Sequence, residues 1–141
     1  MKINNVVVIG SGTMGSGIAA QLCNANIPVT LLDLKTEISQ KAKERIEKSR
    51  PPLLIDKSKI HGIKVGNISD DFKVVSEADW IVEAVVERID IKHEIYDKIF
   101  KERKKDSIVS SNTSSIPISV LSEKMTEVDK KDFCITHFFN P

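Results

Sequence analysis

Glycines and isolated polar side chains that could take part in chemistry follow the apolar runs of this sequence. The stretch Gly10-Ser11-Gly12-Thr13-Met14-Gly15 comes directly after an aliphatic run at residues 6–9. Later runs are followed in turn by Asp33, Glu87, Ser114 and His137. If the runs are parallel strands, their carboxyl ends share one edge of an open α/β sheet, where such sheets bind ligands. We therefore expect these groups to meet in one site.

The glycine stretch has the spacing of a phosphate-binding turn between a strand and a helix. Gly10 allows a sharp turn, Gly12 has no side chain to keep a pyrophosphate from the backbone, and Gly15 lets the helix lie close to the strand. The free N–H groups of the helix's first turn, which begins at Thr13 and Met14, then face the phosphates together with the positive end of the helix dipole. The pattern predicts dinucleotide binding; the alternative is a strand–helix turn that binds nothing.

Asp33 bears on which dinucleotide is bound. It lies 18 residues after Gly15, near the spacing of an acid that accepts a hydrogen bond from a ribose 2′-hydroxyl. A carboxylate there would repel the 2′-phosphate of NADP, so the sequence favours NAD. The nearby Lys35 is a smaller argument in the other direction.

Strands and helices that alternate along the chain must position these groups. We expect strands at residues 6–9, 27–32, 63–66, 80–86, 107–111 and 133–136. Helices are expected after the glycine turn and at 36–49, 70–78 (capped by Ser69 or Asp70), 89–104 and 116–124. This order predicts one α/β domain over residues 1–141, of the Rossmann type, with a doubly wound, mainly parallel sheet. Glu83 falls inside an expected strand, and its role is left open.

Composition argues against several other classes of protein. The net charge is +1, from 21 basic and 20 acidic residues, which gives no electrostatic case for binding nucleic acid or a membrane surface. Cys23 and Cys134 have no metal-ligand spacing and are interpreted as core thiols in a reducing compartment, and no metal site is predicted. No signal peptide or transmembrane run is recognised, so we expect a cytoplasmic protein; the alternative is one in an organelle that has lost its targeting segment.

Several motifs together resemble the L-3-hydroxyacyl-CoA dehydrogenase family, in order and with fitting spacing over almost the whole chain. Beside the glycine turn they are Val82-Glu83-Ala84-Val85-Val86-Glu87, Ser111-Asn112-Thr113-Ser114-Ser115 and His137-Phe138-Phe139-Asn140-Pro141. The last of these is the most specific. The stretches Arg50-Pro51-Pro52-Leu53-Leu54 and Glu77-Ala78-Asp79-Trp80 are most similar to longer members that carry an enoyl-CoA hydratase region on the same chain.

The resemblance implies an NAD-dependent enzyme that interconverts 3-hydroxyacyl-CoA and 3-ketoacyl-CoA. It implies that His137 is the catalytic base, that Ser114 forms a hydrogen bond to the reacting oxygen, and that Asn140 lies near the nicotinamide and the base. Glu87 and Lys92 match positions that contact the cofactor. Taken alone, a serine in a loop, an asparagine before a proline or a lysine on a helix would more often be structural or solvent-exposed.

The sequence departs from the family pattern in two places. A glutamate that orients the histidine in the family would lie beyond Pro141, as would the helical domain that closes the substrate cleft and makes most contacts of the homodimer. We therefore expect residues 1–141 to bind NAD but to turn over little substrate by themselves. The segment 35–62 is too short for the family's helical hairpin, so no CoA-contacting residues are assigned.

Two further functions remain open from the sequence. One is a related dehydrogenase of hydroxy acids or sugar acids, against which Phe138 and Phe139 argue. The other is a non-catalytic dinucleotide-binding module, against which the joint presence of Ser114, His137 and Asn140 argues.

Overall fold

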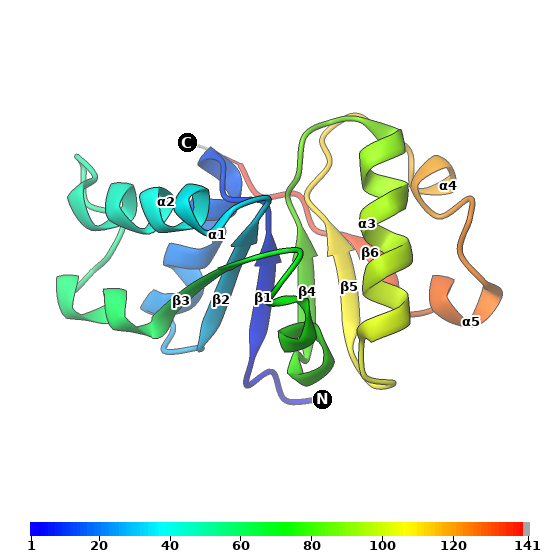
Figure 1. Cartoon of the computed structure of the whole chain (residues 1–141), viewed down its shortest axis with the longest axis horizontal. Coiled ribbons are helices and arrows are strands. Elements are labelled where there is room, and N and C mark those ends of the chain that lie inside the picture. Colours follow the sequence, from blue (N-terminus) through cyan, green and yellow to red (C-terminus); the bar gives the residue numbers. More distant parts are fainter. Residues whose placement is uncertain (140–141) are drawn as a thin grey trace.

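Short, mostly buried strands form one parallel six-stranded sheet in the order β3-β2-β1-β4-β5-β6. The computed structural model describes residues 1–139. The strands are β1 (Val6–Ile9), β2 (Val29–Asp33), β3 (Ile63–Asn67), β4 (Trp80–Glu83), β5 (Ile108–Ser111) and β6 (Phe133–Ile135). This order confirms the predicted Rossmann-type doubly wound fold, and all the carboxyl ends point to one edge, at the top of Figure 1.

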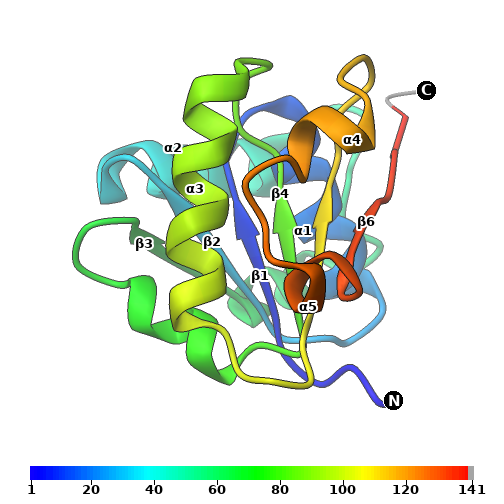
Figure 2. The ribbon, with the colours of Figure 1, turned by 90° about the vertical axis from the view of Figure 1, so that its right-hand side faces the viewer.

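Helices cover the two faces of the sheet. They are α1 (Thr13–Asn24), α2 (Thr36–Lys48), α3 (Ile89–Glu102), α4 (Ile118–Leu121) and α5 (Glu127–Lys130), with 3₁₀ helices η1 (Lys57–Gly62) and η2 (Phe72–Glu77). Figure 2 shows α3 on one side of the sheet and α1 on the other. From β1 the chain builds the sheet outward to β2 and β3, and from β4 it builds in the opposite direction to β5 and β6. Because each crossover is right-handed, α1 and α2 cover one face and α3, α4 and α5 cover the other.

The core follows from the two-residue period of β1. Val6 and Val8 pack into the apolar cluster that includes α1 and α2. Val7 and Ile9 pack into the cluster that includes α3. All four side chains are almost completely buried, as expected for a strand covered on both faces.

The structure differs from the expected boundaries where polar contacts end an element. β4 ends at Glu83 rather than running to Val86, because the chain turns at Ala84 to pass close over Gly10. The expected helix at 70–78 is the shorter 3₁₀ helix η2, because the Asp70 N–H donates to Asn67 Oδ1 and so belongs to a turn. The predicted cap at Ser69 or Asp70 is therefore wrong, and the expected helix at 116–124 is shortened to α4.

The prediction that both cysteines are core thiols is half wrong. Cys23 is buried, but Cys134 is exposed. On β6, Phe133 points into the core formed with α3, so Cys134 points to the opposite face. The helices of that face, α1 and α2, pack chiefly on β1, β2 and β3, and leave the edge strand uncovered there.

Candidate cofactor and active site

The glycine turn depends on two glycines that the fold itself requires. Gly10 has φ +104°, and a Cβ there would lie 2.4 Å from the carbonyl oxygen of Ala84. A Cβ on Gly15 would lie 1.8 Å from the carbonyl oxygen of Gly10. Any side chain at these positions would separate β1, α1 and the chain that leaves β4. Gly12, in contrast, is exposed, and a Cβ there would meet no atom of residues 1–139 within 4 Å.

The N-terminus of α1 provides unpaired backbone donors beside Gly12. Gly12 is the N-cap and has no side chain, and the first bond of the helix runs from the Ser16 N–H to the Gly12 carbonyl. The N–H groups of Thr13 and Met14 precede that bond, so α1 gives them no acceptor. This open, positively polarised cradle fits a pyrophosphate.

Asp33 closes the other side of the turn. Its Oδ2 accepts hydrogen bonds from the Ser11 N–H (2.8 Å) and from Ser11 Oγ (2.5 Å). The carbonyl of Ser11 in turn accepts from Arg45 Nη2 (3.1 Å) and Ser16 Oγ (3.0 Å). The carboxylate thus lies against the glycine turn at the end of β2, on the side where the sequence places the adenosine ribose.

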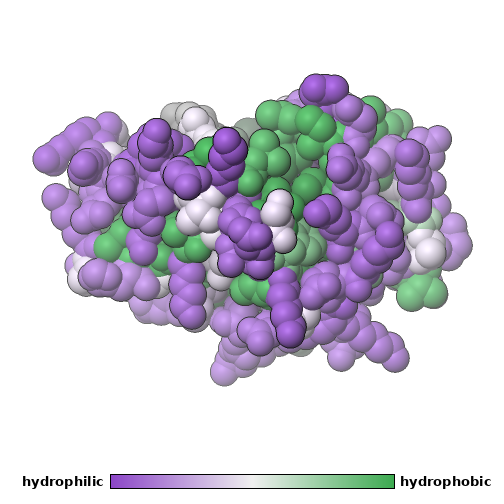
Figure 3. Space-filling view, in the orientation of Figure 1, coloured by the Kyte–Doolittle hydropathy of each residue, from purple (hydrophilic) through white to green (hydrophobic). Residues whose placement is uncertain are grey.

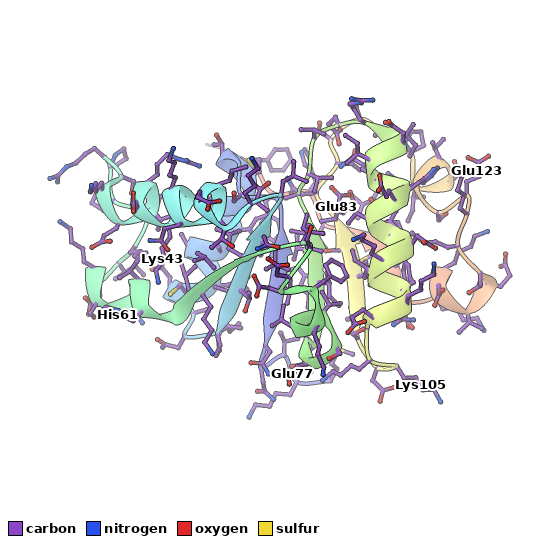
Figure 4. All side chains as sticks on the ribbon, viewed as in Figure 1. Lys43, His61, Glu77, Glu83, Lys105 and Glu123 are labelled. Carbon is purple, nitrogen blue, oxygen red and sulfur yellow. The ribbon has the colours of Figure 1, made fainter. Side chains whose placement is uncertain are left out.

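Glu83 is the site residue whose role sequence reasoning left open. It is the last residue of β4, completely buried, and lies beside α3 at the carboxyl edge of the sheet (Figure 4). Its Oε2 accepts from Lys92 Nζ at 2.6 Å and from the Val85 N–H at 2.9 Å. Its Oε1 accepts from Ser111 Oγ at 2.7 Å and from the Tyr96 hydroxyl. Burial, reinforced by the charge of Glu83, raises the pKa of Tyr96, so its hydroxyl stays protonated as a donor.

Lys92 links that buried carboxylate to Glu87. The alternative of a solvent-exposed lysine is wrong, because only 1% of the Lys92 side chain is exposed. Its Nζ lies 2.6 Å from Glu83 Oε2 and 3.0 Å from Glu87 Oε1. The position of Lys92 on the first turn of α3 brings the ammonium back to the end of β4, and the two carboxylates make its burial tolerable.

Glu87 binds the loop that follows β5. Its Oε2 accepts from Thr113 Oγ1 (2.8 Å), Ser115 Oγ (3.0 Å) and the Ser114 N–H (3.3 Å). Burial would raise the pKa of the Glu87 carboxyl, but the hydrogen bonds from Lys92, Thr113 and Ser115 outweigh it and lower the pKa to about 2. Glu87 is therefore ionised at neutral pH and holds the loop of Ser114 against the start of α3.

These groups surround a cavity of about 260 Å³ at the carboxyl edge. Residues that the sequence singled out line it from four separate segments: Met14, Glu87, Lys92, Ser114 and His137. Apolar surface gathers in this part of the molecule, beside α3, whereas hydrophilic side chains cover most of the lower edge (Figure 3). A larger hollow of about 420 Å³ lies between α3 and α4–α5, and none of the predicted site residues among residues 1–139 lines it.

Asn112 positions the segment that carries His137, and sequence reasoning assigned it no role. Its Oδ1 accepts a hydrogen bond from the Phe138 N–H at 2.8 Å, and it also lines the cavity. The available signal was its place directly after β5, beside Ser114 in the same motif. The imidazole of His137 is exposed and lies edge-on to Phe139, with ring centroids 4.5 Å apart. Asn140 lies outside the described residues.

Within residues 1–139, no cluster of three or more His, Cys, Asp or Glu side chains is arranged to hold a metal ion. In the same part of the chain, every helix is too short or too polar to cross a membrane.

Known proteins resemble this chain over its whole length. Residues 5–141 match the family model described as 3-hydroxyacyl-CoA dehydrogenase, NAD binding domain. A probable 3-hydroxyacyl-CoA dehydrogenase of Deinococcus radiodurans is 42% identical, covering 100% of this chain and 43% of that protein. A putative fatty acid oxidation complex trifunctional enzyme of Rickettsia felis is also 42% identical, covering 99% of this chain and 20% of that protein. The chain thus spans less than half the length of these curated relatives.

Solved structures show the same fold. The crystal structure of 3-hydroxybutyryl-CoA dehydrogenase from Escherichia coli K12 superposes with a TM-score of 0.86 at 26% identity, covering 100% of this chain and 30% of that one. The open glycine turn fits the dinucleotide that the family model specifies, so NAD is the cofactor. The chain belongs to the family of NAD-binding domains of the 3-hydroxyacyl-CoA dehydrogenases.

Proposed function

We propose that the protein to which this domain belongs oxidises 3-hydroxyacyl-CoA to 3-ketoacyl-CoA, or catalyses the reverse reaction, with NAD. One observation carries the proposal. The side chains suited to this chemistry, Ser114 and His137, line the same cavity as Met14 of the glycine turn and as Glu87 and Lys92. A substrate hydroxyl bound in that cavity beside the nicotinamide would therefore be within reach of a hydrogen-bond donor and of a base.

Each residue then has a defined part in the reaction. NAD, when bound, accepts a hydride from the carbon of a secondary alcohol. The imidazole of His137 takes the hydroxyl proton, since imidazoles accept protons near neutral pH. Ser114 donates a hydrogen bond to the same oxygen as it becomes a carbonyl. Asn140, next in the motif, is proposed to lie beside the base and the nicotinamide.

The cofactor contacts divide between the two ends of NAD. Gly10, Gly12 and Gly15 shape the turn, and the N–H groups of Thr13 and Met14 receive the pyrophosphate. Asp33 accepts from the ribose hydroxyls of the adenosine, while Glu87 and Lys92 contact the ribose of the nicotinamide.

The substrate and the partner subunit engage parts of the protein outside these residues. We propose that a helical domain beyond residue 141 completes the acyl-CoA cleft and forms a homodimer. The length of the relatives supports this, since the matched region covers 43% of one and 20% of another.

Two measurements test the proposal. Titration of the 141-residue chain with NADH and NADPH, followed by nucleotide fluorescence, should give much tighter binding of NADH. Equal affinities for NADH and NADPH would contradict the role assigned to Asp33. If neither nucleotide binds, the assignment of the cofactor site is wrong. In the complete protein, His137→Ala should abolish acetoacetyl-CoA reduction and leave NADH binding intact; surviving turnover would show that another group is the base.

A further inference from the structure

Glu83 lies behind the cofactor cavity and does not line it. The charged residues that line it are Glu87 and Lys92, and Lys92 is held in turn by Glu83. Glu83 is the deepest of these, with none of its surface exposed. Its four hydrogen-bond partners are all donors, which is the environment of an ionised carboxylate.

The contacts of Glu83 reach the cavity along two routes. On one, Oε2 holds the ammonium of Lys92 at 2.6 Å, and this side chain lines the cavity with 1% of its surface exposed. On the other, Oε1 holds Ser111 Oγ at 2.7 Å, and Ser111 Oγ accepts the Thr113 N–H at 3.1 Å, immediately before Ser114. The Glu83 carboxylate therefore holds both the Lys92 ammonium, which is proposed to contact the cofactor, and the loop that carries Ser114, the proposed hydrogen-bond donor to the reacting oxygen.

The cluster also has a net charge. Glu83 and Glu87 each contribute one negative charge and Lys92 contributes one positive charge, so the sum is −1 beside the cavity. The nicotinamide ring is positively charged in NAD⁺ and neutral in NADH. A net negative charge near that ring favours the oxidised form, because it attracts the positively charged ring of NAD⁺ and not the neutral ring of NADH.

We propose that Glu83 is a positioning residue of the cofactor cavity, which fixes Lys92 Nζ and the Ser111–Ser114 loop from behind and biases the cavity toward NAD⁺. This inference rests on the proposed function, because it assumes that the nicotinamide end of NAD occupies the cavity.

The test is Glu83→Gln in the 141-residue chain, with dissociation constants measured for both NADH and NAD⁺. The amide nearly keeps the shape but removes the charge and has one acceptor oxygen for the four donors that the carboxylate serves, so the hold on the Lys92 ammonium is lost or weakened. We expect NADH to bind about tenfold more weakly, the scale of a lost hydrogen bond to a charged group. NAD⁺ should weaken by about a further threefold, because the favourable charge is lost only for the cation. In a Lys92→Met background the same substitution should weaken NADH by no more than about threefold, because Glu83 then has no ammonium to hold and only the route through Ser111 remains.

A matched control distinguishes positioning from simple stabilisation. Arg103 is also buried, at the other end of α3, and pairs with Asp129 at 3.2 Å and Asp132 at 2.9 Å. Arg103→Gln should lower the melting temperature and leave both nucleotide affinities unchanged. If it weakens both nucleotides as Glu83→Gln does, Glu83 is only structural.

A second variant keeps the inference testable if Glu83→Gln does not fold. Ser111→Ala retains every charge and removes only the route to the loop. It should weaken NADH about threefold, because the loop loses the neutral hydrogen bond from the Thr113 N–H to Ser111 Oγ. If Glu83→Gln and Ser111→Ala bind both nucleotides as tightly as the wild type, the inference about Glu83 is wrong and the proposed function is unaffected. Failure of the wild-type chain to bind either nucleotide would instead overturn the proposed function, and this inference with it.

Discussion

Gly12→Ala separates the folding role of the glycine turn from its binding role. Gly12 is the N-cap of α1, with φ −69° and ψ −165°, a conformation open to alanine. An added Cβ meets nothing within 4 Å, so the folded protein accommodates it. Among the described residues the methyl group would meet no protein atom, so it would obstruct a ligand placed against the backbone of the turn.

The expected magnitudes follow from this geometry. Alanine is a poorer N-cap than glycine, but it also reduces the entropy of the unfolded chain, and the two effects are each about 0.5–1 kcal/mol with opposite signs. The free energy of unfolding should therefore change by less than about 1 kcal/mol, or about 4 °C in melting temperature. A phosphate oxygen bonded to the turn would overlap the new methyl group, so the NADH dissociation constant should rise at least about tenfold, or about 1.4 kcal/mol.

The assay pairs thermal unfolding with NADH titration on the same samples. Gly17→Ala is the matched control, because a Cβ there also meets nothing within 4 Å and the position lies more than one turn into α1. It should raise stability by about 0.5–1 kcal/mol, as alanine does in a helix interior, and leave NADH affinity unchanged. A Gly12→Ala variant that binds NADH like the wild type would refute the placement of the pyrophosphate.

Other perturbations test the fold around the site. Gly15→Ala should destabilise the protein by about 3 kcal/mol in urea unfolding, since its Cβ would lie 1.8 Å from the Gly10 carbonyl oxygen and the helix must move; an unchanged midpoint would contradict this. Hydrogen bonds hold the pKa of Glu87 and of Asp79 near 2, below their ordinary values of 4.5 and 3.8, so stability present above pH 4.5 should be lost as the pH falls toward 2. In melting curves from pH 7 to 2, Glu87→Gln should flatten this decline, and an unaltered slope would show that Glu87 does not contribute.

Most of the fold could be predicted because its signals are local. Apolar runs such as residues 6–9 are too short for helices, and their continuous apolar character is typical of strands covered on both faces. Glycines mark where the chain turns. The alternation of strands and helices then leaves few topologies, since parallel crossovers are right-handed. The ends of elements were less predictable. β4 ends before Ala84, which lies close to Gly10, a residue distant in the sequence. Asp70 lies outside the expected helix because its N–H donates to Asn67 in a turn.

The candidate site was predicted in part for the same reason. Asp33 ends β2, the residues Glu87, Ser114 and His137 follow later strands, and parallel strands bring their carboxyl ends to one edge. Asn112 went unassigned, because an asparagine in a loop has no distinguishing pattern until its partner, the Phe138 N–H, is known.

The sequence by itself determined the glycine turn, the order of the elements and the edge at which the polar groups gather. These depend on backbone sterics and on the two-residue period of strands, which act over a few residues. Only the tertiary structure decided that Glu83 and Lys92 are buried together and that Cys134 is exposed. Burial and charge pairing depend on which elements face one another, and a charged residue in a strand or on a helix has the same local sequence whether it meets water or a partner.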